Sequence, residues 1–426
     1  MSALAQILLT RGVRVSGSDR QMSPIAQKLI DKGADVKIGH NAQNIGDAEL
    51  VVYTAAIAQA NVELVAARAN GVTCLERADF LGKLMVDYNV PIAVSGTHGK
   101  TTTTAMLACI MLAAELDPTV MVGGELAQID GNLRLGGSEY LVFEACEYVE
   151  SFLNFNPKVA LVLNVEADHL DYYKDIDHIK NSFGKFLDRL PVDGIAVINA
   201  ADGHAMEVAA DFQGRTVTYG ASGSDFEVRN AVRSEFDVLH DGEQVAKVRL
   251  NVLGDHNVSN ALGAFAVAYT LGIPAECIVQ GLEMFRGTAR RLEYKGEFAG
   301  IKVYDDYAHH PTEISATLNA SKELGAKRVW CVFQPHTYTR TRALFKDFVT
   351  ALGGADRVVV TDIYAARENN PGGGDSRDIA MQVNGAVHIS DFNEIVDFIR
   401  KNARDGDVVL TMGAGDVYKI GEILIA

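Results

Sequence analysis

Short apolar runs alternate with helical stretches along most of the 426 residues of this chain. Among the early runs are VRVSGSD, ADVKIG and AELVVYTAAI, and helical stretches such as SPIAQKLIDKG separate them. This alternation predicts parallel strands joined by crossover helices, because parallel neighbours in a sheet need a long connection between them. The sequence therefore predicts an α/β fold.

Two boundaries divide the chain, which is too long for one ordinary core. The first lies near LMVDYNVPIAVSG, where Pro91 precedes a fresh strand, and the second lies in FRGTARRLEYKGEFAG. Between them, FEVRNAVRSEFDVLHDGEQVAKVRLNVLG alternates as antiparallel strands of a half-exposed sheet do, and HNVSNALGAFAVAYTLGI predicts a helix. We predict three α/β domains, at residues 1–88, 89–290 and 291–426.

Charge and cysteine usage exclude several classes of protein. The chain has 55 Asp and Glu against 39 Lys and Arg, and its formal charge of −16 argues against broad binding to nucleic acid or anionic membranes. The five cysteines show no CxxC spacing, which argues against a disulfide framework or a zinc site and favours a reducing compartment. No apolar run is long enough to span a bilayer, and the first residues lack the charged head of a signal peptide. We expect a cytoplasmic protein without membrane insertion.

The segment SGTHGKTTTTAML (95–107) predicts a phosphate-binding loop that opens a helix. Backbone N–H groups of a glycine-rich turn can surround phosphate oxygens while the helix directs its positive end at them. Lys100 would reach the β- and γ-phosphates of a nucleotide, and the Thr101 hydroxyl would bind Mg²⁺. The usual GxxxxGK[ST] spacing would place a glycine at Val94, so this loop is shortened and begins at Gly96. The alternative is a strand, a turn and a helix with chance glycines.

Acidic residues end two strands predicted after this loop. EYLVFEAC runs into Glu144, and VALVLNVEADHLD ends in Glu166, Asp168, His169 and Asp171. Carboxylate and imidazole groups near phosphates could hold Mg²⁺, although imidazole is an unusual magnesium ligand. The alternatives are a solvated loop acid at Glu144 and a structural histidine at His169.

Three polar clusters follow the strands predicted near the C-terminus. DDYAHHP (305–311) could supply charge, a metal contact or a general base. QPHTYTRTR (334–342) adds guanidinium groups suited to a carboxylate or phosphate, and GAGD (413–416) is a weak glycine-turn signal. Ligands of open α/β sheets collect at such strand ends. Structural His–Asp networks and an exposed arginine-bearing helix face are the alternatives.

In this order, the motifs resemble those of the Mur ligase family of peptidoglycan synthesis. The matching segments are SGSD, GTHGKTTT, EACEYVESFL, NVEADHLD, GDHNVSNA, RRLE, DDYAHHPTE, FQPHTYTRT and MGAGD. The resemblance implies Rossmann-like N- and C-terminal domains around a central P-loop ATPase-like domain. It also implies an ATP- and Mg²⁺-dependent carbon–nitrogen ligase, in which a carboxylate becomes an acyl phosphate that an amine attacks. DDYAHHP together with FQPHTYTRT and GAGD favours the branch that joins L-alanine to the lactyl carboxylate of UDP-N-acetylmuramate.

The resemblance also implies roles for individual residues. The ATP site would comprise Gly96, Thr97, His98, Gly99, Lys100, Thr101, Thr102, Asn257, Asn260 and Asp306, with the two asparagines at adenine. The metal ligands would be Thr101, Glu144 and His169. The catalytic residues would be Lys100, Glu144, His169, Arg291 and His309. The uridine site would be lined by Ser18, Asp19 and His40, and L-alanine by Tyr307, His309 and Arg340. We expect no partners beyond small-molecule substrates, and a monomer or homodimer.

The chain departs from the family pattern at three places. Later ligases of the pathway carry a modified lysine where this chain has Phe183, which is consistent with the alanine-adding branch. Thr337 replaces the first arginine of FQPHRYTRT, so amino-acid binding would depend more on Arg340. Relatives begin with a strand and a GxGGxGMS loop, whereas this chain starts inside that motif. We therefore expect a misplaced start or a truncation. If the 426 residues are all that is made, we expect impaired folding of the first domain and weak binding of the UDP substrate.

Other functions stay open at this point. A tripeptide-adding relative of murein recycling shares GTHGKTTT and the AHHP cluster. A nucleotide-binding pseudoenzyme would explain the missing N-terminal loop, but intact Lys100, Glu144, His169 and Asp306 weigh against it. A mechanical P-loop ATPase would not need a further α/β domain with a second cluster of polar residues. Dependence of ATP turnover on an amino acid separates these possibilities.

Overall fold

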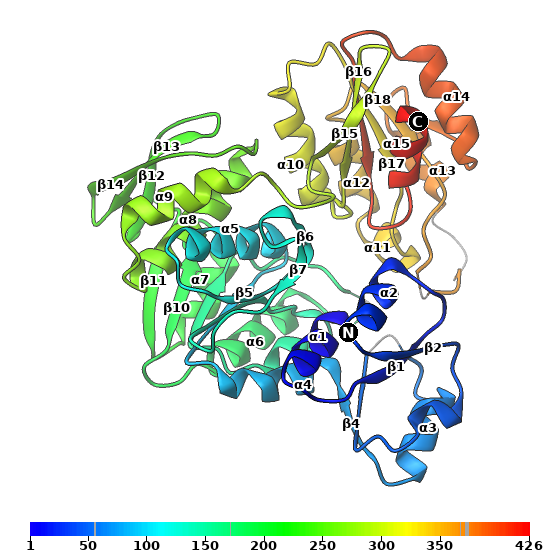
Figure 1. Cartoon of the computed structure of the whole chain (residues 1–426). Helices are drawn as coiled ribbons and strands as arrows, with labels where there is room; N and C mark the ends of the chain where they lie inside the picture. Colours follow the sequence, from blue (N-terminus) through cyan, green and yellow to red (C-terminus); the bar gives the residue numbers. More distant parts are fainter. Residues whose placement is uncertain (55–56, 171, 367, 371–374) are drawn as a thin grey trace.

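A computed structural model describes residues 1–54, 57–170, 172–366, 368–370 and 375–426 (Figure 1). It contains three α/β parts, so the predicted fold class is confirmed; the boundaries at 88/89 and 290/291 stay predictions. Residues 55–56, near the end of the strand predicted in AELVVYTAAI, and Asp171 lie outside the described residues. Within the part of the chain that is described, no helix is both long and apolar enough to cross a membrane.

The N-terminal part contains two separate pairs of parallel strands. Its elements are α1 (Ser2–Thr10), β1 (Ser16–Asp19), α2 (Pro24–Asp31), β2 (Asp35–Ile38), η1 (Ala42–Ile45), β3 (Leu50–Tyr53), α3 (Val62–Ala69), β4 (Thr73–Glu76), α4 (Arg77–Leu84) and η2 (Met85–Asp87). Strand β1 pairs with β2 and strand β3 with β4, and among the described residues no strand joins the two pairs. This part therefore has short ladders in place of one continuous sheet.

The central part is built on one sheet of ten strands. Its first elements are β5 (Val90–Ser95), α5 (Lys100–Ala113), β6 (Thr119–Leu126), η3 (Ala127–Ile129), β7 (Gly131–Arg134), β8 (Tyr140–Glu144), η4 (Tyr148–Asn154) and β9 (Val159–Val162). They are followed by α6 (Ile176–Leu187), β10 (Ile195–Asn199), α7 (Gly203–Ala210), β11 (Arg215–Tyr219), β12 (Phe226–Val232), β13 (Glu235–His240), β14 (Glu243–Arg249), α8 (Asp255–Thr270) and α9 (Ala275–Met284). The strand order is β14-β13-β12-β11-β10-β9-β5-β8-β6-β7.

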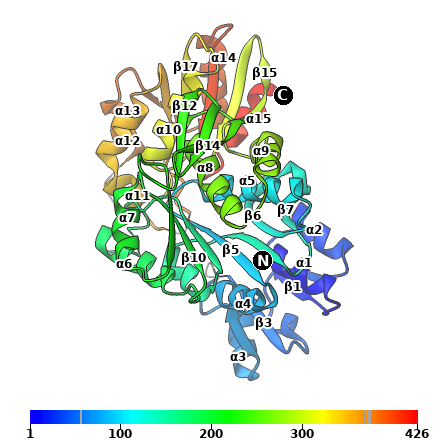
Figure 2. The same ribbon diagram turned by 90° about the vertical axis from the view of Figure 1, so that its left-hand side faces the viewer.

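Successive residues of the buried strands point to opposite faces of this sheet and enter two different cores. Ile92 and Val94 of β5 pack with α5, α8 and α9, whereas Ala93 packs with α6 and α7 on the other face (Figures 1 and 2). The predicted antiparallel segment is confirmed, because β12 pairs with β13 and β13 with β14 in antiparallel ladders. The predicted small-residue helix is α8, whose alanines allow it to pack closely in the core.

The C-terminal part has a sheet of six strands, in the order β15-β16-β20-β17-β18-β19. Its elements are β15 (Glu293–Phe298), β16 (Ile301–Asp306), α10 (Pro311–Lys322), β17 (Val329–Phe333), α11 (Tyr338–Ala343), α12 (Phe345–Leu352), β18 (Arg357–Val360), α13 (Ser376–Gln382), β19 (Val387–His388), α14 (Phe392–Asn402), β20 (Val408–Met412) and α15 (Tyr418–Ile425). All its pairings are parallel except that of β15 with β16. Helices α10, α12 and α13 cover one face, and α14 and α15 cover the other.

The polar clusters predicted from the sequence come together because of this topology. Strands β9, β5 and β8 are parallel neighbours, so the loops that follow them share one edge of the central sheet. Strands β16, β20 and β17 are also parallel neighbours, and their loops share one edge of the C-terminal sheet. In Figure 1 the C-terminal part lies above the central part, and ion pairs connect the two edges.

Close packing of α9 on α5 makes the central core sensitive to one added methyl group. A Cβ on Gly281 would lie 2.3 Å from the Cα of Ile110, which belongs to the backbone of α5 and cannot rotate away. Because overpacking of a core costs about 1–3 kcal/mol, we expect Gly281→Ala to lower the melting temperature. Thermal unfolding followed by circular dichroism checks this.

Gly184→Ala is the matched control for this substitution. Gly184 lies within α6, and its added Cβ would meet nothing within 4 Å. Since alanine favours a helix over glycine by about 1 kcal/mol, this variant should unfold at the same or a higher temperature than the parent. Equal melting temperatures for Gly281→Ala and the parent would contradict the tight packing.

Candidate active site

The loop between β5 and α5 has the conformation that two of its glycines permit. Gly96 has φ +137° and Gly99 has φ +85°, which other residues rarely adopt. A Cβ on Gly96 would come within 2.9 Å of the Leu163 side chain, so the loop also packs closely on the segment after β9. Asn164 fixes the turn, because its Oδ1 accepts from the His98 N–H at 2.8 Å and its Nδ2 donates to the His98 carbonyl at 3.2 Å. The two glycines and Asn164 therefore fix the conformation of the loop.

Lys100, the first residue of α5, is held by oxygen atoms. Its ammonium donates to the carbonyls of Gly96 and Thr97, the latter at 3.0 Å, and to Glu147 Oε2 at 2.8 Å. Burial acts to lower the pKa of Lys100, but the negative charge of Glu147 outweighs it and the pKa is raised. Lys100 is therefore protonated and positively charged at neutral pH, next to the loop predicted to bind phosphate.

Glu144 lies beside Thr101 at the end of β8. Thr101 Oγ1 donates to Glu144 Oε2 at 3.0 Å, and the Gly123 N–H donates to the other carboxylate oxygen. Burial raises the pKa of Glu144, although these donors and Lys100 act to lower it. Two of the three predicted metal ligands are therefore in contact, and both offer the oxygen atoms that Mg²⁺ prefers.

His169, the third predicted metal ligand, is paired with Glu147. His169 Nε2 lies 3.5 Å from Glu147 Oε1, and the His169 ring packs on Tyr148 with centroids 4.5 Å apart. Burial acts to raise the pKa of Glu147, but the charges of Lys100 and His169 outweigh it and hold that pKa below its usual value. Glu147 is 3% exposed, so this carboxylate joins the loop lysine and His169 inside the protein.

His98 connects the loop to the C-terminal part. Its Nδ1 lies 3.2 Å from Glu313 Oε1, and its Nε2 lies 3.5 Å from Glu166 Oε2. Burial acts to lower the pKa of His98, but hydrogen bonds and charge from Glu166 and Glu313 outweigh it and raise the pKa to about 9. Glu313 belongs to the first turn of α10, where it also accepts from the His309 and His310 N–H groups.

Arg340 and Asp168 form a second connection between the two parts. Arg340 Nε and Nη2 lie 3.0 and 2.9 Å from Asp168 Oδ1, and both side chains are largely buried. Burial acts to raise the pKa of Asp168, but the Arg340 guanidinium outweighs it and holds the pKa well below its usual range. Arg340, predicted to pair with the amino-acid carboxylate, already pairs with a carboxylate of the protein.

The DDYAHHP cluster is buried around the end of β16. Asp306 accepts from the N–H groups of Leu292 and Ala308, and burial raises the pKa of Asp306 to about 6. His309 Nδ1–H donates to the Tyr307 carbonyl at 3.0 Å, which leaves Nε2 as the acceptor of the neutral ring. Burial lowers the pKa of His309 to about 4, so the ring is neutral at physiological pH.

Two arginines approach the tyrosine of this cluster. Arg291, predicted to be catalytic, lies over the Tyr307 ring at 5.4 Å, and its Nη1 is 3.8 Å from Glu313 Oε1. Arg290 lies over the same ring at 4.9 Å and pairs with Asp305 at 2.8 Å. Both arginines therefore contact the C-terminal part, and both line the cavity described below.

The predicted adenine residues lie at the start of α8, beside the phosphate loop. Asn260 Nδ2 donates to Asn257 Oδ1 at 3.4 Å, and Asn257 Nδ2 donates to the Leu253 carbonyl at 2.7 Å. A Cβ on Gly99 would come 2.6 Å from Asn260 Oδ1, which places Asn260 directly against the loop.

The predicted uridine residues form a separate group in the N-terminal part. Ser18 Oγ donates to Glu63 Oε2 at 2.6 Å and lies 3.1 Å from His40 Nδ1. His40 Nδ1 is also 3.2 Å from Glu63, whereas Asp19 is exposed at the end of β1. Ser18 and His40 are thus together, with a carboxylate that the sequence did not indicate.

A cavity of about 1010 Å³ opens where the three parts meet. Its lining includes Lys28 from the N-terminal part, Thr101 and Glu144 from the central part, and Arg291 and Tyr307 near the start of the C-terminal part. This volume lies at the upper end of the usual range for small-molecule sites.

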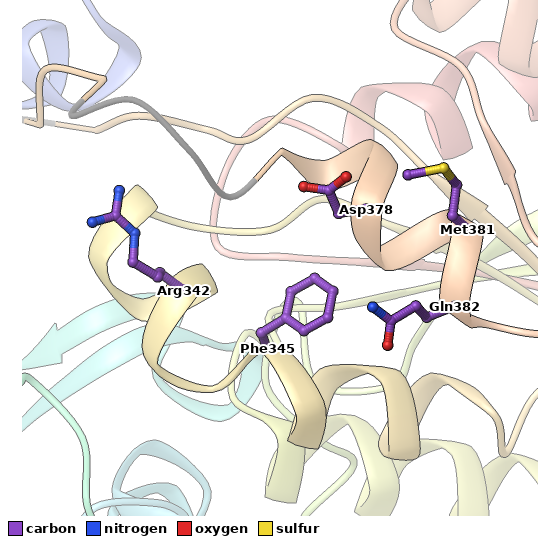
Figure 3. Close-up of a pocket in the computed structure, with 5 residues that line it drawn as sticks. All are labelled: Arg342, Phe345, Asp378, Met381 and Gln382. Carbon is purple, nitrogen blue, oxygen red and sulfur yellow. The ribbon is translucent and has the colours of Figure 1, made fainter.

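A second, smaller pocket of about 340 Å³ lies between α11, α12 and α13 (Figure 3). Its lining residues are Arg342, Phe345, Asp378, Met381 and Gln382, none of which is a predicted site residue.

Sequence reasoning missed the residues that orient the predicted ones. Glu147, Glu313 and Asn164 bind Lys100, His98 and the loop backbone, respectively. A signal existed for Glu147, because it follows Glu144 by three residues in EACE. Glu313 stands where a capping box places its acid, three residues after His310. Asn164 opens NVEADHLD, one of the segments that carry the family resemblance, but its residue type after a strand did not indicate that it binds the loop.

Models of one protein family match three successive parts of the chain. Residues 1–89 match the Mur ligase family catalytic domain, residues 94–268 the Mur ligase middle domain, and residues 290–415 the glutamate ligase domain of Mur ligases. The chain is 48% identical to a UDP-N-acetylmuramate–L-alanine ligase of Clostridium novyi and 49% identical to one of Acetivibrio thermocellus. These alignments cover 100% of this chain and 94% and 93% of those proteins.

Solved structures extend the comparison to the fold. The crystal structure of a UDP-N-acetylmuramate–alanine ligase from Thermotoga maritima matches with a TM-score of 0.84 at 29% identity, covering 100% of this chain and 95% of that one. A murein peptide ligase from Psychrobacter arcticus matches with a TM-score of 0.77 at 26% identity and the same coverage. Because the chain is 48–49% identical to the ligases of Clostridium novyi and Acetivibrio thermocellus over its whole length, it belongs to the Mur ligase family.

Proposed function

We propose that this chain is an ATP-dependent ligase that joins L-alanine to the lactyl carboxylate of UDP-N-acetylmuramate through an acyl phosphate. The observation that carries the proposal is that the predicted phosphate-binding site and the predicted amino-acid-binding site face each other. The phosphate loop with Lys100 and Thr101 lies at one edge, and His309 and Arg340 lie at the edge that faces it. Relatives at 46–49% identity bear the name of this reaction.

Transfer of the γ-phosphate needs positioned positive charge more than covalent chemistry. In the proposed reaction the lactyl carboxylate oxygen attacks the γ-phosphorus of ATP, and ADP leaves. Lys100 would neutralise charge on the phosphates, which requires its ammonium to leave the Gly96 and Thr97 carbonyls.

The residues at Thr101 and Glu144 fit a magnesium ion. A hydroxyl and a carboxylate in contact at 3.0 Å, both next to the phosphate loop, are hard oxygen donors. We propose that Thr101 and Glu144 hold Mg²⁺ and that His169 completes the set, for which its ring must leave Glu147. When bound, Mg²⁺ supplies charge neutralisation on the phosphates.

Amide formation requires an unprotonated amine close to the acyl carbon. The amine nitrogen of alanine attacks that carbon, and phosphate leaves with the former carboxylate oxygen. We propose that neutral His309 contacts the amine through Nε2, since Nδ1–H is engaged by the Tyr307 carbonyl. Arg340 would bind the alanine carboxylate and share its guanidinium with Asp168.

Two alternative activities are separated by the same assay. A tripeptide-adding ligase has support from the structural likeness to a murein peptide ligase. A pseudoenzyme would bind nucleotide without turnover, and the Lys100–Glu147 and Thr101–Glu144 contacts weigh against it because they keep the reactive groups in place.

Phosphate release with Mg-ATP tests the function. UDP-N-acetylmuramate and L-alanine are each added or omitted, and we expect release only when both are present, with UDP-N-acetylmuramoyl-alanine as product. Lys100→Ala is the inactive control. Release that needs the free tripeptide in place of alanine would establish the recycling activity instead, and binding of ATP without any release would establish the pseudoenzyme.

Glu147→Gln tests the carboxylate that joins Lys100 and His169. Because residues that orient such groups typically contribute a factor of about 10–100, we expect kcat to fall by that factor. Glu150→Gln is the matched control: Glu150 lies in the same segment but contacts Ser182 and Lys185, so kcat should stay near the parent value. Parent-like kcat in a folded Glu147→Gln variant would contradict the role of Glu147.

A further inference from the structure

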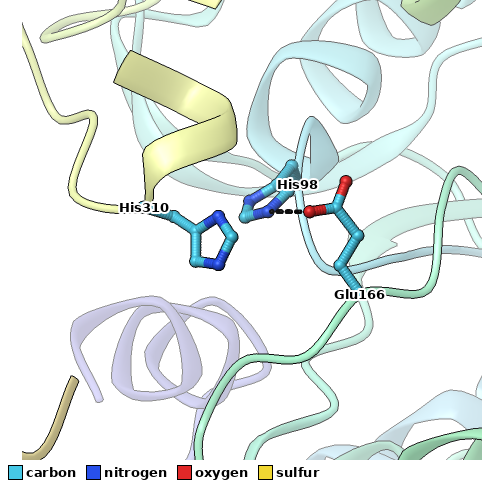
Figure 4. Close-up of side chains that lie close together, drawn as sticks. All are labelled: His98, Glu166 and His310. Carbon is cyan, nitrogen blue, oxygen red and sulfur yellow. Dashed lines mark ion pairs between the residues drawn. The ribbon is translucent and has the colours of Figure 1, made fainter. Parts of the chain in front are cut away.

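Three metal-binding side chains meet at the junction of the central and C-terminal parts (Figure 4). They are His98 of the phosphate loop, Glu166 after β9 and His310, the residue before α10. One donor atom from each lies within 4.8 Å of the other two. In Figure 4 the two imidazole rings and the carboxylate point toward one another from three separate segments.

Nε2 of His310 is buried without a hydrogen-bond partner, and the whole of His310 is only 5% exposed. Nε2 of His98 is also buried, and it faces Glu166 Oε2 at the long distance of 3.5 Å. Buried polar atoms without a partner are rare because each costs free energy. The ring centroids lie 4.6 Å apart, so both nitrogens border the same small space.

The surroundings orient two of the three groups as metal ligands. Glu313 Oε1 accepts from Nδ1 of His98 at 3.2 Å, so loss of the other ring proton of the His98 imidazolium would give Nε2 a lone pair for a metal. This carboxylate–histidine arrangement is the usual support of a metal-bound imidazole. Thr312 Oγ1 donates to Glu166 Oε2 at 2.8 Å and fixes the carboxylate.

We propose that His98, Glu166 and His310 bind one divalent transition-metal ion, of the class of Zn²⁺ or Co²⁺. Two imidazoles and one carboxylate suit these ions rather than Mg²⁺. Bonds of about 2.0–2.1 Å in a tetrahedron put ligand atoms about 3.3 Å apart, so the side chains must draw in by roughly 1.5 Å at most. The cysteine spacing argued against a zinc site, but the proposed ligands are two histidines and one glutamate, so that argument does not apply to them.

Charge around the group favours a cation. Glu166, Glu313 and Asp168 contribute negative charge around the two histidines, and Arg291 Nη1 lies 3.8 Å from Glu313 Oε1. Binding would displace the proton on Nε2 of the His98 imidazolium, which faces Glu166. At His310, binding would break the long hydrogen bond in which Nδ1 accepts from the Thr312 N–H at 3.3 Å. A neutral ring with a metal on Nε2 carries its proton on Nδ1, which then cannot accept.

The proposed ion would tie the phosphate loop to the first turn of α10. His98 lies in the loop after β5 of the central sheet, and His310 lies in the loop after β16 of the C-terminal sheet. One ion would therefore hold the facing edges of the two sheets together without nucleotide. The site shares no ligand with the predicted magnesium set of Thr101, Glu144 and His169. The two sites can therefore be removed separately.

Titration of the full chain with Co²⁺, after dialysis against a chelator and without nucleotide or Mg²⁺, tests the site. We expect visible absorption bands of low-coordinate cobalt that saturate near one equivalent and that Zn²⁺ abolishes. His310→Asn should weaken this binding by about tenfold or more, since asparagine keeps a helix-capping oxygen but not the imidazole.

Two histidine variants complete the experiment. His169→Asn removes a predicted magnesium ligand and His178→Asn removes a histidine on α6, and both should bind Co²⁺ as the parent does. Retained binding in His310→Asn, with loss in His169→Asn, would place the ion at the magnesium set and overturn the proposal. Absence of stoichiometric Co²⁺ binding by the folded parent would also overturn it.

Discussion

The buried ion pair between Asp168 and Arg340 is the contact on which the assembled site most depends. It joins the segment after β9 to α11, and both side chains are largely removed from water. Removing one partner of such a pair leaves an uncompensated buried charge, which typically costs about 3–5 kcal/mol. The pair therefore fixes how the edge of the C-terminal sheet faces the phosphate loop, and the His98–Glu313 contact acts at the same junction.

Internal carboxylates organise the site before any substrate is present. Glu147 satisfies Lys100 and His169, Glu144 satisfies Thr101, and Glu313 satisfies His98. In the proposed reaction, phosphates and a substrate carboxylate would take over some of these contacts. The carboxylates of the protein thus keep groups such as Lys100 and His98 positively charged. Phosphates and the substrate carboxylate would bind at the same cationic groups.

Much of the fold followed from local patterns. Alternating apolar runs predicted the parallel strands, and the two-residue alternation in 226–254 predicted the antiparallel extension of the central sheet. The loop at Gly96–Thr101 was predictable because strand, glycines, lysine and helix are contiguous in sequence. Glu144 was predictable for a different reason, since it ends an apolar run whose strand was expected to lie near the loop, and β8 does pair with β5.

Contacts between distant segments could not be predicted in this way. Nothing local to Arg340 indicates that its partner is Asp168, 172 positions away, and His98 and Glu313 are 215 positions apart. The separation of the N-terminal strands into two pairs also depends on tertiary arrangement, because β1–β2 and β3–β4 each have ordinary βαβ spacing. Side-chain pairing across domains is set by packing, which periodicity does not encode.

Transfer of an oxygen atom from substrate to phosphate tests the central claim most directly. UDP-N-acetylmuramate labelled with ¹⁸O in its lactyl carboxylate is incubated with Mg-ATP, L-alanine and the chain, and the released phosphate is analysed by mass spectrometry. An acyl-phosphate route predicts that each phosphate carries one oxygen atom from the carboxylate. Unlabelled phosphate formed together with the amide product would show that the carboxylate is not phosphorylated and would contradict the account.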